Sequence, residues 1–215
     1  MRGLLEKDIR LLLQRKNMLL LFIILAFSLG MSQSGAFILG YLPFLILVVL
    51  ISTISYDEIE NGYQFLMTLP VNRKLYVQEK YLLCILGAIG SWIVADILYF
   101  VAKLVRDEEI ILKEELQMIV SFLPVIFLMM SIIIPLQLKF GAEKSRIVLL
   151  GTLGAVGAAI HILTKLIGNE KINVVLQQLD SIQDKLIVAV GIGFMLIVIV
   201  VSFLISCRIM DRKEL

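Results

Sequence analysis

Six long apolar stretches cover most of this chain, and short charged segments separate them. An α-helix needs about 20 mainly apolar residues to cross roughly 30 Å of hydrocarbon, at a rise of about 1.5 Å per residue. The chain is 60% hydrophobic and 18% charged, whereas a soluble domain is about 45–50% apolar and about 25% charged. We therefore expect an all-α, polytopic membrane protein, with residues 1–215 forming one transmembrane domain. The predicted spans are residues 18–32, 36–55, 81–102, 116–138, 147–167 and 186–207.

The positive charges predict how these spans are oriented, because the connections that stay in the cytoplasm are rich in Lys and Arg. Most of the 20 Lys and Arg residues lie before the first span, after the last span and in the connections 56–80 and 139–146. This bias places both termini in the cytoplasm and predicts a multi-pass protein of the inner (cytoplasmic) cell membrane, surrounded by lipid bilayer. The net charge of +2 therefore gives no indication of nucleic-acid binding.

Residues 1–16 have the pattern of a helix that lies on the inner membrane surface. Leu5, Ile9 and Leu12 recur at helical spacing, while the charged residues fall largely on the other side. The alternative is a basic segment that only orients the first span.

The segments between the spans differ in length and pattern. Residues 56–80 form the longest cytoplasmic connection, and residues 139–146 form a second, shorter cytoplasmic loop. Residues 168–185 predict an amphipathic helix on the outer side, because their apolar residues share one helical face. The charged residues 106–115 predict a solvated extension of the fourth span.

The sequence lacks the usual residues of catalytic and metal sites. It contains one His and two Cys residues, no glycine-rich phosphate loop and no nucleophile elbow. We therefore do not expect an enzyme, and we expect no catalytic, cofactor or metal site in this chain. Cys84 and Cys207 lie at the cytoplasmic ends of predicted spans, where a disulfide is not expected.

Two polar residues lie inside predicted spans, Asp96 in the third and His161 in the fifth. A charged Asp near the bilayer centre costs roughly 2.5–3.5 kcal/mol, so its side chain should face protein or water. One interpretation is a transport path that both residues line. The other is a structural hydrogen bond between helices, or an Asp close enough to the outer surface to reach water.

The first cytoplasmic connection, residues 56–80, contains the run FLMTLPVNR at residues 65–73, after an acidic turn that includes Glu58, Glu60 and Gly62. This pattern resembles the coupling segment of type-2 ABC exporter permeases, in which an acidic turn with a glycine precedes L-x-T-L-P-V-[ST]-R. Asn72 stands where the family pattern has a hydroxyl residue, and Asn also caps helices well. The resemblance covers the whole length, from the interfacial helix through the six spans.

The resemblance implies a permease subunit that pairs with a second permease copy or a related permease, as a homodimer or a heterodimer. It also implies a separate ATP-binding cassette subunit, which would bind ATP and Mg, because this chain has no nucleotide-binding motif. A short helix before Pro70 would dock in a groove of that ATPase. The residues expected to couple the ATPase are Asp57, Glu58, Glu60, Gly62, Phe65, Leu69, Pro70, Arg73, Glu143 and Lys144.

Other functions stay open on the sequence. A non-transporting scaffold or assembly subunit would use the same connection to bind a cytosolic partner. An ion-driven secondary transporter would have inverted repeats and broken helices with carboxylates at the midplane, and neither is evident here. For an exporter, the apolar outer halves of the spans favour amphipathic cargo, first a peptide, with a lipid-like molecule or a drug as alternatives.

Overall fold

The chain folds into helices joined by short connections. The computed structural model describes the backbone of residues 2–32, 35–58, 62–68, 72–167 and 184–213. It describes the side chains of these residues except 64, 65, 67, 142, 143, 145–167 and 184–190. Within these ranges there is no strand. The helices are α1 (Arg2–Gln14), α2 (Lys16–Ser32), α3 (Phe37–Glu58), α4 (Gly62–Thr68), α5 (Arg73–Val105), α6 (Leu112–Ile167) and α8 (Asp184–Arg212).

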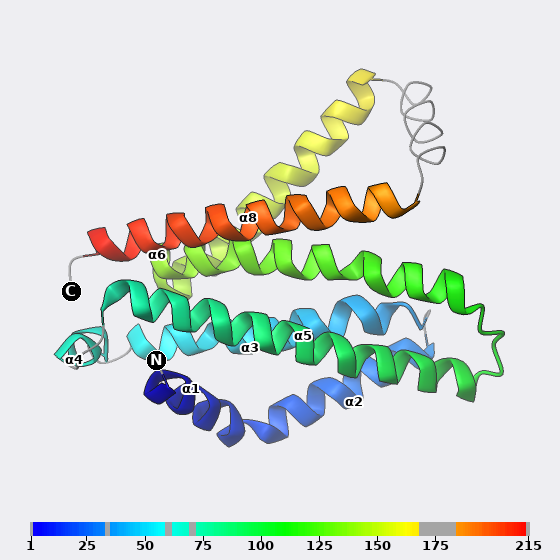
Figure 1. Cartoon of the computed structure of the whole chain (residues 1–215), viewed down its shortest axis with the longest axis horizontal. Coiled ribbons are helices and arrows are strands. Elements are labelled where there is room, and N and C mark those ends of the chain that lie inside the picture. The colour runs from blue at the N-terminus through cyan, green and yellow to red at the C-terminus, as the bar shows by residue number, and fades with distance from the viewer. Residues whose placement is uncertain (1, 33–34, 59–61, 69–71, 168–183, 214–215) are drawn as a thin grey trace.

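The long helices lie side by side in a bundle around α3 (Figure 1). Helix α3 contacts α2, α5 and α6, and α8 packs against α5 and α6. The short helix α4 lies at one end of the bundle, together with the start of α1 and the end of α8 (Figure 1). We call this end the α4 end. Both termini of the described chain therefore lie near the same end of the bundle.

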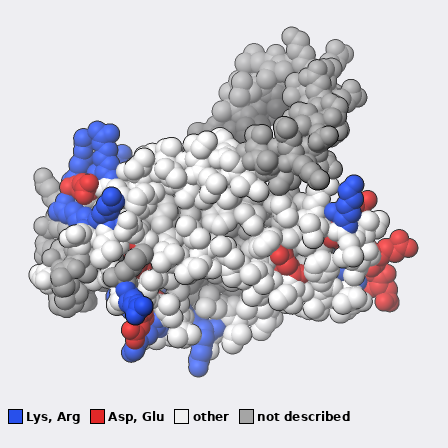
Figure 2. All heavy atoms as spheres, viewed as in Figure 1, with Lys and Arg blue, Asp and Glu red and all other residues white. Residues whose placement is uncertain are grey.

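Four helical segments are long and apolar enough to cross a membrane: Phe37–Glu58, Arg73–Val105, Leu112–Gly141 and Gly191–Arg212. Helices α1 and α2 together qualify as a fifth candidate, bent by 64°. In the view of Figure 2, most charged residues lie toward the two ends of the described bundle, and the surface between them is largely uncharged. The prediction of an all-α, multi-pass membrane protein is confirmed, while the number of six spans and their orientation stay predictions.

The connections differ from the expectations in two places. Helix α5 ends at Val105 and α6 begins at Leu112, so the predicted helical extension is wrong for residues 106–111, where Asp107 has a φ of 51°. Residues 139–146, predicted as a loop, are helical on both sides of Gly141, where φ is 72° and ψ is −177°. After this break the chain leaves the bundle and runs back toward the opposite end (Figure 1).

The bundle packs through two groups of buried apolar side chains. One lies toward the α4 end and includes Ile54, Tyr76 and Leu138; the other lies toward the opposite end and includes Leu39 and Tyr99. Many large apolar side chains are exposed along the bundle, as expected for residues that face lipid. Since lipid is as apolar as these side chains, close packing and polar contacts decide how the helices associate.

We expect Gly141→Ala to lower the free energy of unfolding by about 1–3 kcal/mol, because its φ and ψ lie in a region that is essentially restricted to glycine. An added Cβ would also lie 2.6 Å from Oε2 of Glu58. Thermal unfolding of the purified protein in detergent measures the effect. Gly90→Ala is the matched control, because no heavy atom lies within 4 Å of its added Cβ. Equal stability of the two variants would contradict a strained break at Gly141.

Candidate functional site

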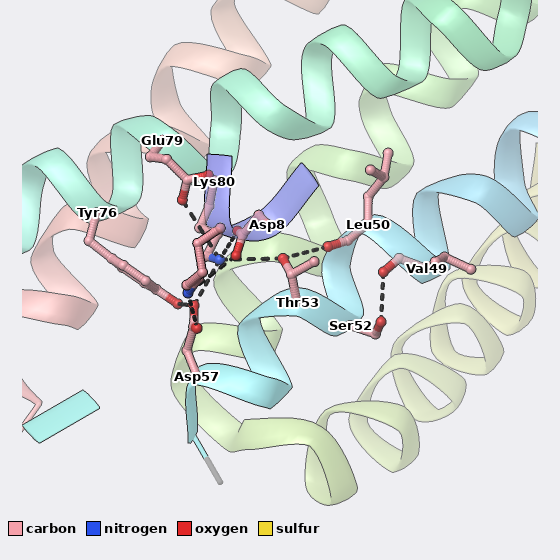
Figure 3. Close-up of polar contacts among 10 residues, drawn as sticks. Asp8, Val49, Leu50, Ser52, Thr53, Asp57, Tyr76, Glu79 and Lys80 are labelled. Carbon is pink, nitrogen blue, oxygen red and sulfur yellow. Dashed lines mark hydrogen bonds and ion pairs between the residues drawn. The ribbon is translucent and has the colours of Figure 1, made fainter. Parts of the chain in front are cut away.

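A group of buried charges joins three helices near the α4 end (Figure 3). Lys80 of α5 pairs with Asp8 of α1, and its Nζ lies 2.8 Å from Oδ2 of Asp57 in α3. Lys7 pairs with Asp57 as well and lies 3.2 Å from Oδ1 of Asp8. The Tyr76 hydroxyl donates a hydrogen bond of 3.0 Å to Oδ2 of Asp57. We call Lys7, Asp8, Asp57, Tyr76 and Lys80 the Lys80 cluster.

The members of the Lys80 cluster are buried except for the partly exposed Lys7, so their charges depend on one another. Asp8, Asp57 and Lys80 are almost inaccessible, and a buried charge without a partner is strongly unfavourable. The two lysines balance the two aspartates. Glu79 is also buried, with Lys80 Nζ 3.7 Å from its Oε2. The position of α1 on the bundle is therefore determined by charge pairing as well as by apolar contact.

A second set of contacts joins the end of α3 to the end of α8 and to the break in α6. Lys213 Nζ lies 3.0 Å from Oε1 of Glu58 and donates to the carbonyl of Leu138 at 3.3 Å. The backbone of Gly141 approaches the same Glu58 carboxylate, leaving no room for a side chain there. The chain can bring these segments together because position 141 is a glycine.

Helix α4 is attached to the bundle by one face. Tyr63 and Leu66 are buried, and the Tyr63 ring makes an edge contact with Tyr76, with the ring centroids 5.6 Å apart. Lys213 Nζ lies 4.4 Å from the centroid of the Tyr63 ring, a cation–π contact. Burial raises the pKa of Tyr63 to about 12, so its hydroxyl stays protonated at neutral pH. Through Tyr63, α4 contacts both the Lys80 cluster and the end of α8.

The start of α5 is also tied to the end of α8. The Arg73 guanidinium donates to the backbone carbonyl of Asp211 at 2.5 Å and to that of Met210 at 3.3 Å. Asn72 precedes the helix in the extended conformation of an N-cap, although its side chain makes no capping hydrogen bond. Arginine is well suited to this position, because carbonyl groups at a helix C-terminus have no partner within the helix.

The structure gathers several of the predicted coupling residues at the α4 end. Glu58, Gly62 and Arg73 lie there, and Lys144 is exposed just after the break in α6. Asp57 points into the bundle and belongs to the Lys80 cluster, so it connects the coupling segment to the core. Of the other predicted residues, Phe65 and Glu143 lie in helices but their side chains are outside the description, and Glu60, Leu69 and Pro70 lie outside the described residues.

The two proposed path residues are not brought together in the described part of the structure. Asp96 is half-buried in α5, and its Oδ1 has no hydrogen-bond partner among the described residues. His161 lies in the second part of α6, and its side chain is outside the description. Among the described residues, no group of three or more His, Cys, Asp or Glu side chains is arranged to hold a metal ion.

Sequence reasoning missed most of the contacts that hold this site. It placed Asp8 among the charges on the polar side of residues 1–16 and Lys80 among the basic residues of the connection 56–80, and it predicted no pairing between them. The available signal was the placement of ionisable residues immediately beside apolar stretches: Lys7 and Asp8, Asp57, and Glu79 and Lys80. Such residues face either water or one another, and the sequence does not distinguish the two arrangements.

A bundle of apolar helices with a short helix between two of its spans defines a multi-pass membrane protein. The model of one protein family, described as ABC-2 family transporter protein, matches residues 3–211. The chain therefore belongs to the ABC-2 transporter family and is a permease subunit, which confirms the resemblance seen in its sequence. Neither curated proteins nor solved structures gave a match to the chain.

We expect Lys80→Met to lower the free energy of unfolding by about 3–5 kcal/mol, because it leaves two buried aspartates without their main partner. Thermal and denaturant unfolding in detergent measure the loss. Arg10→Met is the matched control: the Arg10–Glu6 pair is 74% and 63% exposed, so its loss should cost about 0.5 kcal/mol or less.

Adding Asp8→Asn and Asp57→Asn to Lys80→Met should restore part of the stability, because the uncompensated charges are then removed. If Lys80→Met were no more harmful than Arg10→Met, the Lys80 cluster would not hold these helices together.

Proposed function

We propose that this permease forms the translocation path of an ATP-driven exporter and that a separate ATPase subunit docks at the α4 end. The observation that carries the proposal is the position of α4. It lies at the end of the bundle, between two long apolar helices, and one of its faces is fixed by Tyr63 and Leu66. Thr68, at its last turn, is exposed. A partner that holds α4 therefore acts on the helices behind it.

The contacts of α4 suggest how such an action is passed on. Tyr63 contacts Tyr76, which donates to Asp57 at the end of α3. Asp57 pairs with Lys80, one turn beyond Tyr76 on α5. A displacement of α4 thus reaches α3 and α5 at the same point, and the buried charges resist separation of the two helices. In this mechanism the ATPase binds ATP and Mg. The permease contributes the translocation path and the helices that move when α4 is displaced.

The same proposal places the α4 end in the cytosol. Both termini of the described chain lie near this end (Figure 1), and the basic connections of the sequence predict the same side. The protein would then lie in the inner cell membrane with α4 facing the cytosolic ATPase. The segment 168–185 would lie on the outer side.

We further propose amphipathic cargo, with a peptide favoured over a lipid-like molecule or a drug. A second permease copy, or a related permease, would complete the path, as in the pattern that the sequence resembles. Asp96 and His161 are the proposed path residues. Asp96 supports this assignment through its Oδ1, which is buried and has no hydrogen-bond partner among the described residues.

We expect Phe65→Asp combined with Leu69→Asp to abolish binding of the ATPase, because each carboxylate would enter an apolar groove at a cost of about 2 kcal/mol or more. The measurement is co-purification of the partner ATPase with the permease, with ATPase activity after reconstitution as a second readout. Leu66 is left unchanged, because it is buried in the bundle.

The matched control for the docking test carries the same charge change at the opposite end. Leu112 and Leu116 are both largely exposed there, so Leu112→Asp with Leu116→Asp should leave co-purification unchanged. Retention of the ATPase by the Phe65 and Leu69 variant would place the dock elsewhere on the permease. If the ATPase co-purifies with the unaltered permease but the permease does not change its turnover rate, the permease is better described as a scaffold.

Orientation is tested by labelling single cysteines with a membrane-impermeant reagent, in a background without Cys84 and Cys207. We expect labelling in intact cells for cysteines at positions Gln33, Glu108 and Asp180. We expect labelling only after permeabilisation for cysteines at positions Glu60, Glu143 and Arg212. Labelling of the second set in intact cells would reverse the orientation and remove the α4 end from the cytosol.

A further inference from the structure

A pocket of about 800 Å³ lies between α6 and α8, toward the α4 end of the bundle. Part of its lining, which we call the inner part, is apolar, with Ile132, Pro135 and Leu136 contributed by α6 and Ile205 and Ile209 by α8. These residues belong to the apolar segments that qualify as membrane spans. Most of them lie nearer the middle of these spans than the pocket's cationic residues do, so this part of the pocket is the one closer to the hydrocarbon.

The rim of the same pocket is cationic. Lys139 of α6 and Arg208, Arg212 and Lys213 at the end of α8 line it. Lys213 pairs with Glu58. Within the described residues, no carboxylate lies within ion-pair distance of Lys139, Arg208 or Arg212, and all three are exposed. Three cations thus line the pocket, and no carboxylate among the described residues balances their charge.

We propose that this pocket binds an anionic phospholipid from the membrane leaflet on the α4 side. An acyl chain would lie against the apolar inner part, and the phosphate would be held by Arg208 and Arg212 at the rim. A guanidinium group can donate two parallel hydrogen bonds to a phosphate group. Basic pockets between membrane helices suit anionic headgroups. The cavity volume lies in the range of about 300–1,000 Å³ that is typical of ligand sites.

The arrangement argues against other occupants. A free phosphate ion would leave the apolar inner part unfilled. A second copy placed symmetrically over this surface would bring identical cations together, which is unfavourable. A zwitterionic lipid would add its own positive charge beside Arg208 and Arg212. A single negatively charged lipid satisfies both the apolar inner part and the cationic rim.

The position of the site gives the lipid a structural role. Lys139 lies two residues before the break at Gly141, and Lys213 joins the rim to Glu58 and to the carbonyl of Leu138. A bound headgroup would neutralise the repulsion among the rim cations. It would thereby hold the ends of α6 and α8 together beside the break.

The test uses a tryptophan placed in the pocket and lipids that quench it. Trp92, the only tryptophan of the chain, is replaced by Phe, and Leu136→Trp provides the reporter. The permease alone is reconstituted in phosphatidylcholine vesicles that contain brominated phosphatidylglycerol or, at equal mole fraction, brominated phosphatidylcholine. We expect the anionic lipid to quench at a severalfold lower mole fraction. Leu21→Trp, exposed on α2, should be quenched equally by both lipids.

Charge variants then test the rim. Arg208→Gln with Arg212→Gln should weaken the preference for the anionic lipid by about fivefold for each cation removed, while Arg208→Lys with Arg212→Lys should keep most of it. Arg2→Gln with Lys16→Gln removes the same charge outside the pocket and should leave the preference unchanged. Inorganic phosphate added to the vesicles should not relieve the quenching.

Four outcomes would overturn the proposal. Equal quenching by both lipids would make the pocket an ordinary lipid-facing surface, and absence of quenching would mean that protein covers it. Relief by inorganic phosphate would identify a simple anion site. An equal loss of preference in the variant with Arg2 and Lys16 replaced would attribute the effect to general surface charge. None of these outcomes depends on ATPase docking, so the proposed function is tested separately.

Discussion

The pairing of Lys80 with Asp8 and Asp57 is the interaction on which the α4 end depends. Three charges are buried together, and each would be strongly unfavourable alone. Apolar contacts between membrane helices discriminate poorly among registers, since lipid competes for the same surfaces. A buried charge has few acceptable partners, so the cluster fixes α1, α3 and α5 relative to one another at a single point.

Polar contacts also secure the opposite end of the bundle, but they join different elements. Tyr99 and Lys103 of α5 bind Glu115 near the start of α6. Arg106 donates to the carbonyls of Gly30 and Met31 at the end of α2, which have no partners within that helix. The apolar band between the two ends has fewer such contacts among the described residues. In such a bundle, polar contacts join the helices at both ends and apolar contacts pack them in the middle. This arrangement suits joined helices that tilt together as one rigid unit.

The sequence predicted the helices better than their contacts. Long apolar stretches can only be helices in a membrane, because the backbone must satisfy its own hydrogen bonds there. A short helix was expected before Pro70, since a proline disfavours the helical conformation of the residue before it, and α4 is found at Gly62–Thr68. The pairing of Asp8 with Lys80, 72 positions apart in the chain, was beyond such reasoning, because local patterns carry no information on which charges meet. The break at Gly141 was expected as a polar loop, and only the backbone angles show that one glycine is sufficient.

The size of α4 explains why its contacts matter for function. A helix of seven residues is too short to be stable by itself, because nucleation is costly and few hydrogen bonds follow it. Its conformation and position must therefore come from Tyr63 and Leu66 on one side and, in the proposed complex, from the ATPase on the other. A segment that is ordered by both neighbours cannot move with one without affecting the other. In the proposed complex, coupling through α4 would therefore follow from its lack of independent stability, and the buried charges behind Tyr76 would pass its displacement to α3 and α5 together.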